Sequence, residues 1–191
     1  MKWINYASPH SLREAVDLLA ERGDRARVLA GGTDILVQLR VGRFELELLV
    51  DVKTIPELNE ITYEPEAGLT LGAAVPCYKI YGNASVSHAY PGLVDAVSLI
   101  GGILIQGRAS IGGNLCNAAP SADSVPALIA LGATVRLWGP NGPRQVAVED
   151  FCTGPGKSDL QHGELMVSLH IPPPEPNSGA RYLRFTPRNE M

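Results

Sequence analysis

The apolar positions near the N-terminus follow the period of an amphipathic helix. They recur three and four residues apart, at Leu12, Ala15, Val16 and Leu19. Ser11 and Glu14 have the spacing of a capping box, in which each side chain accepts a hydrogen bond from a backbone N–H, and Gly23 supplies a stop. The pattern therefore predicts a helix over Ser11–Ala20 that buries one face.

Short apolar runs broken by turn residues continue to about residue 55. They predict a strand, a helix and a second strand, at Arg27–Ala30, Asp34–Val41 and Leu48–Val50. Together with the first helix they form a small N-terminal α/β subdomain over residues 1–55.

Beyond residue 56 the pattern changes to hairpins and separate helices. Residues 65–68 and 139–143 are rich in Pro, Gly and Asn and predict hairpin turns. The predicted strands are Glu60–Tyr63, Leu69–Ala73, Thr134–Trp138, Gln145–Val148 and Leu165–Ile171, with an extended Arg181–Phe185. The predicted helices are Pro91–Ile100 and Ser124–Leu131. We assign residues 56–176 to a second subdomain.

Two glycine-containing segments stand out, and the longer of them, Ala109–Asp123, has almost no large side chains and no helical period. The first, Leu29–Asp34, follows a predicted strand and precedes a predicted helix, an order that presents free backbone N–H groups to an anion. The second, Ala109–Asp123, lies between two predicted helices and contains Gly112 and Gly113, which allow a sharp turn and a close approach of the main chain to a ligand.

Two interpretations of these segments remain open from their chemistry. Two turns lined by N–H groups can hold the two phosphates of a dinucleotide, while Asp34 or Asp123 accepts hydrogen bonds from a ribose. Alternatively, both are ordinary turns in which each aspartate caps the following helix.

Composition and charge exclude several classes of protein. The 191 residues include 16 basic and 20 acidic side chains spread along the chain, a formal net charge of −4, so neither a nucleic-acid footprint nor a membrane-surface patch is present. No apolar run approaches the roughly 18 residues of a membrane span, and residues 1–5 lack the apolar core of a signal peptide. We expect a cytoplasmic protein.

Metal and nucleophilic sites find little support. The three cysteines and four histidines have neither disulfide nor metal-ligand spacing, and no G-x-S-x-G elbow occurs. The Rossmann fingerprint is absent, and Gly154–Ser158 resembles the end of a phosphate loop but has Phe151 where the first glycine is required. We therefore expect no metal and no catalytic side chain.

The order of several motifs closely resembles the FAD-binding medium subunit of the molybdenum hydroxylases, the carbon monoxide dehydrogenase and xanthine dehydrogenase type enzymes. The motifs are Ala30-Gly31-Gly32-Thr33-Asp34, Leu49-Val50-Asp51, Ile55-Pro56-Glu57-Leu58, Ser110-Ile111-Gly112-Gly113-Asn114, Ala119-Pro120-Ser121-Ala122-Asp123, Pro126-Ala127-Leu128, Gly163-Glu164-Leu165 and Ile171-Pro172. The resemblance implies an α+β, PCMH-type FAD-binding fold, with a small N-terminal α/β subdomain and a larger mixed-sheet α/β subdomain.

The resemblance also implies which residues contact FAD. One segment would wrap the pyrophosphate, a second would close over it, Asp123 would meet the ribose, and Leu165 and Arg184 would approach the flavin ring. The two segments consist of Leu29, Ala30, Gly31, Gly32, Thr33 and Asp34, and of Ala109, Ser110, Ile111, Gly112, Gly113 and Asn114.

The implied function is an oxidoreductase subunit that relays electrons. An iron-sulfur small subunit would reduce the flavin, which would pass electrons to NAD or another acceptor, while a molybdopterin large subunit oxidises the substrate. Two alternatives are a non-catalytic interaction subunit that has lost flavin binding, and a flavoenzyme acting alone, for which the sequence nominates no base near the ring.

The chain departs from the family pattern in two places. Where the family commonly has Gln-Ile-Arg-Asn, this chain has Leu104-Ile105-Gln106-Gly107 and so lacks a cation. Arg188-Asn189-Glu190-Met191 ends where family members continue, which predicts a truncated C-terminal region over residues 177–191.

Overall fold

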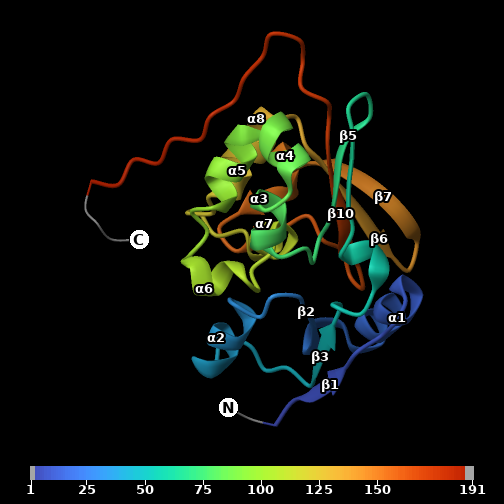
Figure 1. Cartoon of the computed structure of the whole chain (residues 1–191). Coiled ribbons are helices and arrows are strands. Elements are labelled where there is room, and N and C mark those ends of the chain that lie inside the picture. The colour runs from blue at the N-terminus through green and yellow to red at the C-terminus, as the bar shows by residue number, and fades with distance from the viewer. Residues whose placement is uncertain (1–2, 188–191) are drawn as a thin grey trace.

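Two main sheets and a short two-stranded ribbon organise the chain (Figure 1). The computed structural model describes residues 3–187. The smaller sheet, in the order β1-β3-β2, is parallel, and the larger, in the order β4-β5-β10-β6-β7, is antiparallel. The strands are β1 (Asn5–Ala7), β2 (Ala26–Leu29), β3 (Leu48–Asp51), β4 (Ile61–Glu64), β5 (Gly68–Gly72), β6 (Thr134–Gly139), β7 (Gly142–Ala147), β8 (Cys152–Gly154), β9 (Lys157–Ser158) and β10 (Leu165–Ile171).

Short helices connect and cover these sheets. They are α1 (Leu12–Arg22), α2 (Ile35–Arg40), α3 (Cys77–Tyr81), α4 (Ala84–Ala89), α5 (Pro91–Val97), α6 (Ile103–Gln106), α7 (Ile111–Asn117), α8 (Ser124–Ala130) and α9 (Val148–Phe151), with 3-10 turns η1 (Gly23–Arg25) and η2 (Pro56–Leu58). Figure 1 shows α3, α4, α5 and α8 grouped beside the larger sheet, while α1 and α2 belong to the smaller unit below it. The overall α+β class is therefore as predicted. Among residues 3–187, all parallel pairing lies in the smaller sheet.

The N-terminal unit forms as its hydrophobic pattern predicts, with one change in the helix cap. The Ser11 hydroxyl accepts a hydrogen bond from the Glu14 N–H at 3.2 Å. The Glu14 carboxylate, however, accepts from the N–H of His10 at 3.0 Å, one residue before the expected donor. Helix α1 ends at Gly23, which has φ of +55°. The cap thus satisfies two backbone donors before α1 packs onto β2 and β3.

Strand β10 is buried on both faces and joins two hydrophobic cores. Leu165 and Val167 pack with α1 and the smaller sheet, whereas Leu169 and Ile171 pack with the helices beside the larger sheet. A β-bulge between Met166 and Ser168 makes this division possible, because an extra residue inverts the side-chain alternation that follows it. The main chain thus passes from one core to the other within a single strand.

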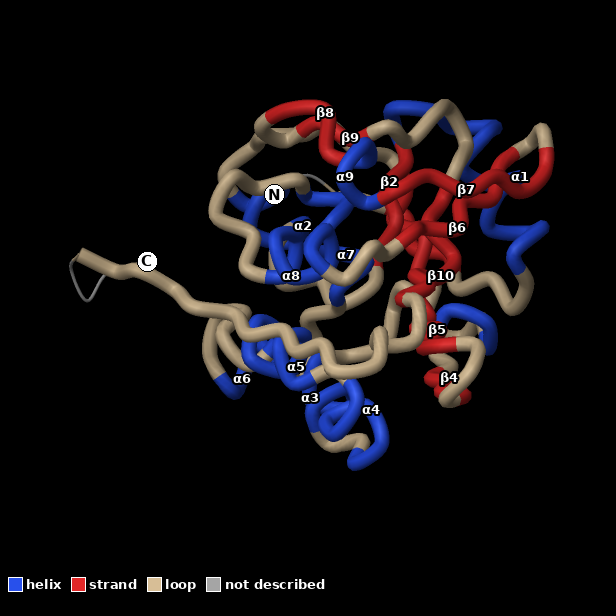
Figure 2. Tube along the Cα trace, turned by 90° about the horizontal axis from the view of Figure 1, so that it is seen from above, coloured by secondary structure: helices blue, strands red, loops and turns tan. Residues whose placement is uncertain are grey.

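Beyond β10 the chain runs as an extended segment over residues 172–187. Figure 2 shows this segment crossing beside α5 and leaving the body of the molecule. It contains the predicted extended Arg181–Phe185, which pairs with no strand among the described residues. Residues 188–191 lie outside the described residues. The division into units at residues 55 and 176 stays a prediction, although the two main sheets fall on either side of residue 55.

The second glycine segment differs from its prediction. It was expected to form a turn, but Ile111–Asn117 is the helix α7, with Gly112 and Gly113 in its first turn. Neither glycine has a positive φ. A Cβ on Gly112 would lie 2.5 Å from the carbonyl oxygen of Ala73, so this glycine is required for close packing of α7 against the end of β5. The sequence singled out Gly112 but did not reveal that close packing against Ala73 requires a glycine there.

Gly112→Ala should lower the free energy of unfolding by about 1–3 kcal/mol, because the added methyl collides with the backbone of Ala73. Urea unfolding measures this change. Gly113→Ala is the matched control, since its Cβ would meet only the Ser110 hydroxyl at 3.1 Å. Equal stability of the two variants would contradict the packing assigned to Gly112.

Candidate functional site

A cleft of about 870 Å³ lies between the N-terminal unit and the rest of the molecule. One wall comes from β2, α2 and the segment between them. The opposite wall comes from α7, the end of β5 and the start of β10. The volume falls in the upper part of the range of small-molecule sites, about 300–1,000 Å³.

The first glycine segment presents main chain to this cleft. Gly32 has φ of +81°, which a residue with a side chain rarely adopts. A Cβ on Gly31 would lie 2.3 Å from the carbonyl oxygen of Arg108, so only glycine permits this approach. Within residues 3–187, the backbone N–H groups of residues 31–34 have no hydrogen-bond acceptor. They are available to an anion.

The second segment reaches the cleft at the start of α7. The Ser110 hydroxyl caps the helix by accepting a hydrogen bond from the Gly113 N–H at 3.1 Å. Apart from that hydroxyl, nothing lies within 4 Å of a Cβ built on Gly113, which lines the cleft. A side chain at Gly113 would therefore enter the space of the cleft.

Direct contacts join the two walls. The guanidinium Nε of Arg108 donates a hydrogen bond to the carbonyl oxygen of Gly31 at 3.1 Å. The amide of Gln38 on α2 donates to the side-chain oxygen of Asn117 at the end of α7 at 2.8 Å. These contacts link segments 77 and 79 residues apart in the sequence and fix the separation of the walls.

The two aspartates do not cap helices through their side chains. Asp34 and Asp123 occupy N-cap positions, but neither side chain makes a capping hydrogen bond. This excludes the side-chain capping considered for both residues. The Asp123 carboxylate instead accepts a hydrogen bond from the Tyr182 hydroxyl at 3.0 Å and lies 3.7 Å from Nε of Arg184. The C-terminal segment thus places Arg184 at the cleft.

Thirteen of the fifteen residues predicted to contact the cofactor line the cleft, including Asp123, Leu165 and Arg184. The other two, Leu29 and Ile111, are 8% and 2% exposed and belong to hydrophobic cores. Those two side chains pack in the hydrophobic cores and anchor the segments there. A residue that lines the cleft does not by that fact contact the cofactor, so the cofactor contacts stay predictions.

The structure adds cationic residues that the sequence did not single out. Arg27 on β2 and Arg43 after α2 lie 5.4 Å and 5.6 Å from the ring centre of Phe44, and all three line the cleft. Cation–π contact holds both guanidinium groups at Phe44, in the lining of the cleft. No motif marks them, because β2 and the α2–β3 loop meet only in the fold.

Gln106, which stands where the family commonly has an arginine, does not line the cleft. Gln106 is 6% exposed; the Tyr81 hydroxyl donates to its side-chain oxygen at 3.2 Å, and its amide donates to the carbonyl oxygen of Ser98 at 2.8 Å. The residue satisfies buried polar groups between α3, α5 and α6. Gln106 itself is therefore part of this buried network and not of the cleft lining.

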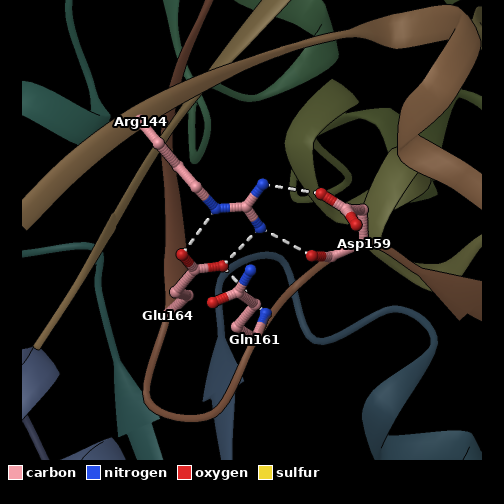
Figure 3. A network of polar contacts seen from close by, with 4 residues as sticks. All are labelled: Arg144, Asp159, Gln161 and Glu164. Atoms are coloured by element: carbon pink, nitrogen blue, oxygen red, sulfur yellow. Dashed lines mark hydrogen bonds and ion pairs between the residues drawn. The ribbon is translucent and has the colours of Figure 1, made fainter. Parts of the chain in front are cut away.

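The loop between β9 and β10 forms a further part of the cleft wall, with residues 160–165 in its lining. Arg144 on β7 holds this loop (Figure 3). Its guanidinium donates to both oxygens of the Glu164 carboxylate at 2.7 Å and to the side chain and carbonyl of Asp159 at 2.6 Å. The Gln161 N–H donates to Glu164 at 2.8 Å.

The cysteines offer no activated nucleophile. Burial raises the pKa of Cys116, which lines the cleft, to about 12, and that of Cys77 to about 11, so both are neutral thiols at pH 7. The described part of the chain contains no group of three or more histidine, cysteine, aspartate or glutamate residues placed to hold a metal ion. Between residues 3 and 187, no helix has the length and apolar character needed to cross a membrane.

Comparison with known proteins gives a consistent family. Residues 2–174 match the family described as FAD binding domain in molybdopterin dehydrogenase. The xanthine dehydrogenase FAD-binding subunit of Escherichia coli O157:H7 is 35% identical over 192 residues, covering 98% of this chain and 65% of that protein. The carbon monoxide dehydrogenase medium chain of Hydrogenophaga pseudoflava is 32% identical, covering 88% and 58%.

Solved structures agree with the sequence relatives. A chain of reconstituted CO dehydrogenase from Oligotropha carboxidovorans superposes with a TM-score of 0.87 at 31% identity, over 91% of this chain and 60% of that one. This similarity confirms the PCMH-type FAD-binding fold. The chain spans about two thirds or less of the length of the proteins it matches.

Acid should weaken the loop that Arg144 holds. Hydrogen bonds from Arg144 lower the pKa of Glu164 from its ordinary value of 4.5. A carboxyl whose pKa is lower in the folded state stabilises the fold above its unfolded pKa, and this stabilisation is lost as the pH falls through the folded value.

Glu164→Gln should therefore lower the free energy of unfolding by about 1.5–3 kcal/mol at neutral pH, the contribution of hydrogen bonds to charged groups. The difference from wild type should shrink as the pH falls below 4.5. Urea unfolding of both proteins across this range tests the expectation. A difference that is independent of pH would contradict it.

Proposed function

Because this chain belongs to the FAD-binding domain family of the molybdopterin dehydrogenases, we propose that it is the FAD-binding electron-transfer subunit of a molybdenum hydroxylase complex. The observation that carries the proposal is the pair of main-chain segments, Gly31–Asp34 and Ser110–Asn114, that line one cleft from opposite sides. The activity of the complex, its substrate and its partners are part of this proposal.

The residues present fit FAD. The free N–H groups of residues 31–34 suit a pyrophosphate, and Arg27 and Arg43 add positive charge to the lining of the same cleft. Gly113 leaves space that any side chain would fill. Asp123 supplies a carboxylate acceptor suited to ribose hydroxyl groups. Backbone donors, cations and an acceptor thus line one cleft.

FAD, when bound, supplies the redox chemistry, and the chain supplies binding and orientation. The N–H groups of the first segment would hold the diphosphate in place. Leu165, which lines the cleft at the start of β10, would approach the flavin from an apolar side, with Arg184 adding a positive charge on the side of the C-terminal segment. No side chain has to exchange a proton for this role, which agrees with the neutral thiol of Cys116.

The proposed route of electrons has three parts. An iron-sulfur small subunit would reduce the flavin, a molybdopterin large subunit would oxidise the organic substrate, and NAD or another acceptor would take electrons from the flavin. The relatives are named for xanthine dehydrogenase and carbon monoxide dehydrogenase, which supports a complex of this class. We place the complex in the cytoplasm.

The purified chain should show a flavin absorption spectrum, alone or after addition of FAD, and should release FAD on denaturation. Absorption spectroscopy followed by chromatography of the released cofactor tests this. A chain that retains no flavin and takes none up would contradict the proposal and favour an interaction subunit that has lost the cofactor.

Gly113→Val should weaken FAD binding at least about tenfold, or about 1.4 kcal/mol, because the side chain enters the cleft. Fluorescence titration gives the dissociation constant. Gly179→Val is the matched control, since Gly179 lies outside the cleft lining with nothing within 4 Å of its Cβ. If both variants bind FAD as wild type does, α7 is not part of the FAD site.

A further inference from the structure

Arg144 lies outside the cleft lining but donates hydrogen bonds to Glu164, which belongs to it. It lies on the edge strand β7, opposite Leu137 of β6, and its side chain extends to Glu164, immediately before β10. Glu164 fits there because residue 139 of β6 is a glycine, whose Cβ would lie 2.5 Å from Cγ of Glu164. Strand β6 therefore leaves room for the ion pair across it.

The geometry of the ion pair requires a guanidinium. Nε and Nη2 donate to the two oxygens of Glu164, while Nη1 and Nη2 donate to the side chain and carbonyl of Asp159. A lysine ammonium is a single point charge and cannot make this planar, bidentate arrangement. The Glu164 side chain is only 7% exposed, so its charge depends on Arg144.

Both ends of the loop are thereby fixed. Asp159 and Glu164 bracket residues 160–163, which line the cleft. Between them, the His162 Nε2 lies 3.0 Å from the carbonyl oxygen of Ala20 at the end of α1. The loop thus touches the N-terminal unit, and Leu165 follows it directly. A shift of the loop would move one wall of the cleft relative to both glycine segments.

We propose that Arg144 is a positioning residue for the FAD cleft, which sets the place of loop 159–164 and of Leu165 from the far side of β6. This inference rests on the proposed FAD-binding function. It assigns to Arg144 an effect on cofactor affinity and on the environment of the flavin, in addition to any effect on stability.

The test compares Arg144→Lys and Arg144→Met in the full chain, with wild type and Arg13→Met alongside. Arg13 makes an ion pair with Asp17 on the outer face of α1 and is 81% exposed, so its loss leaves the cleft untouched. The readouts are the dissociation constant for FAD, the visible circular dichroism of the bound flavin, and amide hydrogen exchange in the loop without FAD.

Both Arg144 variants should bind FAD about tenfold more weakly, at the lower end of the effect of losing groups that orient metal ligands, and should change the circular dichroism of the flavin. Exchange should accelerate at the Gln161 N–H, whose acceptor is Glu164, and stay slow at the Asp159 N–H, which donates to the carbonyl oxygen of Phe151 at 2.8 Å. Arg13→Met should change none of these quantities.

Three outcomes would overturn the inference. If the Arg144 variants bind FAD with wild-type affinity and dichroism, Arg144 has a structural role alone, even if amide hydrogen exchange in the loop accelerates. If Arg13→Met weakens binding equally, the effect is not specific to the loop. If wild type itself takes up no FAD, the proposed function fails and this inference with it. Should Arg144→Met not fold, Arg144→Lys decides between the first outcome and the proposal.

Discussion

The structure depends on burying both faces of one strand. The apolar surface of β10 is divided between two cores, and the bulge between Met166 and Ser168 makes that division possible by inverting the side-chain alternation. Leu165 and Val167 thereby hold the N-terminal unit against the larger sheet. Without the bulge, the apolar residues 165, 167, 169 and 171 would share one face and could not serve two cores.

The cleft is a consequence of that junction. The bulged Val167 accepts a hydrogen bond from the Ala73 N–H at 2.9 Å, and Ala73 in turn packs so closely on α7 that only glycine fits at position 112. Helix α7 is therefore placed by β10 and β5, while the opposite wall is placed by β2. Contacts from Arg108 and Gln38 then fix the distance between the walls.

The chemistry of this cleft is that of holding a ligand. Its walls expose main chain at two glycine segments, its cations are placed by Phe44 and by the C-terminal segment, and its cysteine is a neutral thiol. Such a surface is suited to binding phosphate and to orienting a group that carries its own reactivity. The family of the chain and the architecture of the site thus lead to the same class of ligand by separate arguments.

The sequence alone was enough to predict the helices and strands that have local signals, and to identify the residues of the two glycine segments. Helix α1, both hairpins and β10 follow from periodicity, caps and turn residues, which act within a few positions of the chain. The motifs also identified the family. Local pattern could not reveal that Gly112 lies in a helix, because its requirement is the backbone of Ala73, nor that Arg27, Arg43 and Phe44 meet at the cleft. The same holds for Arg144, because its partner Glu164 is 20 residues away in the sequence and the two side chains meet only across β6. Contacts between segments that are far apart in the sequence depend on how the elements pack in three dimensions. Local sequence patterns therefore do not predict them.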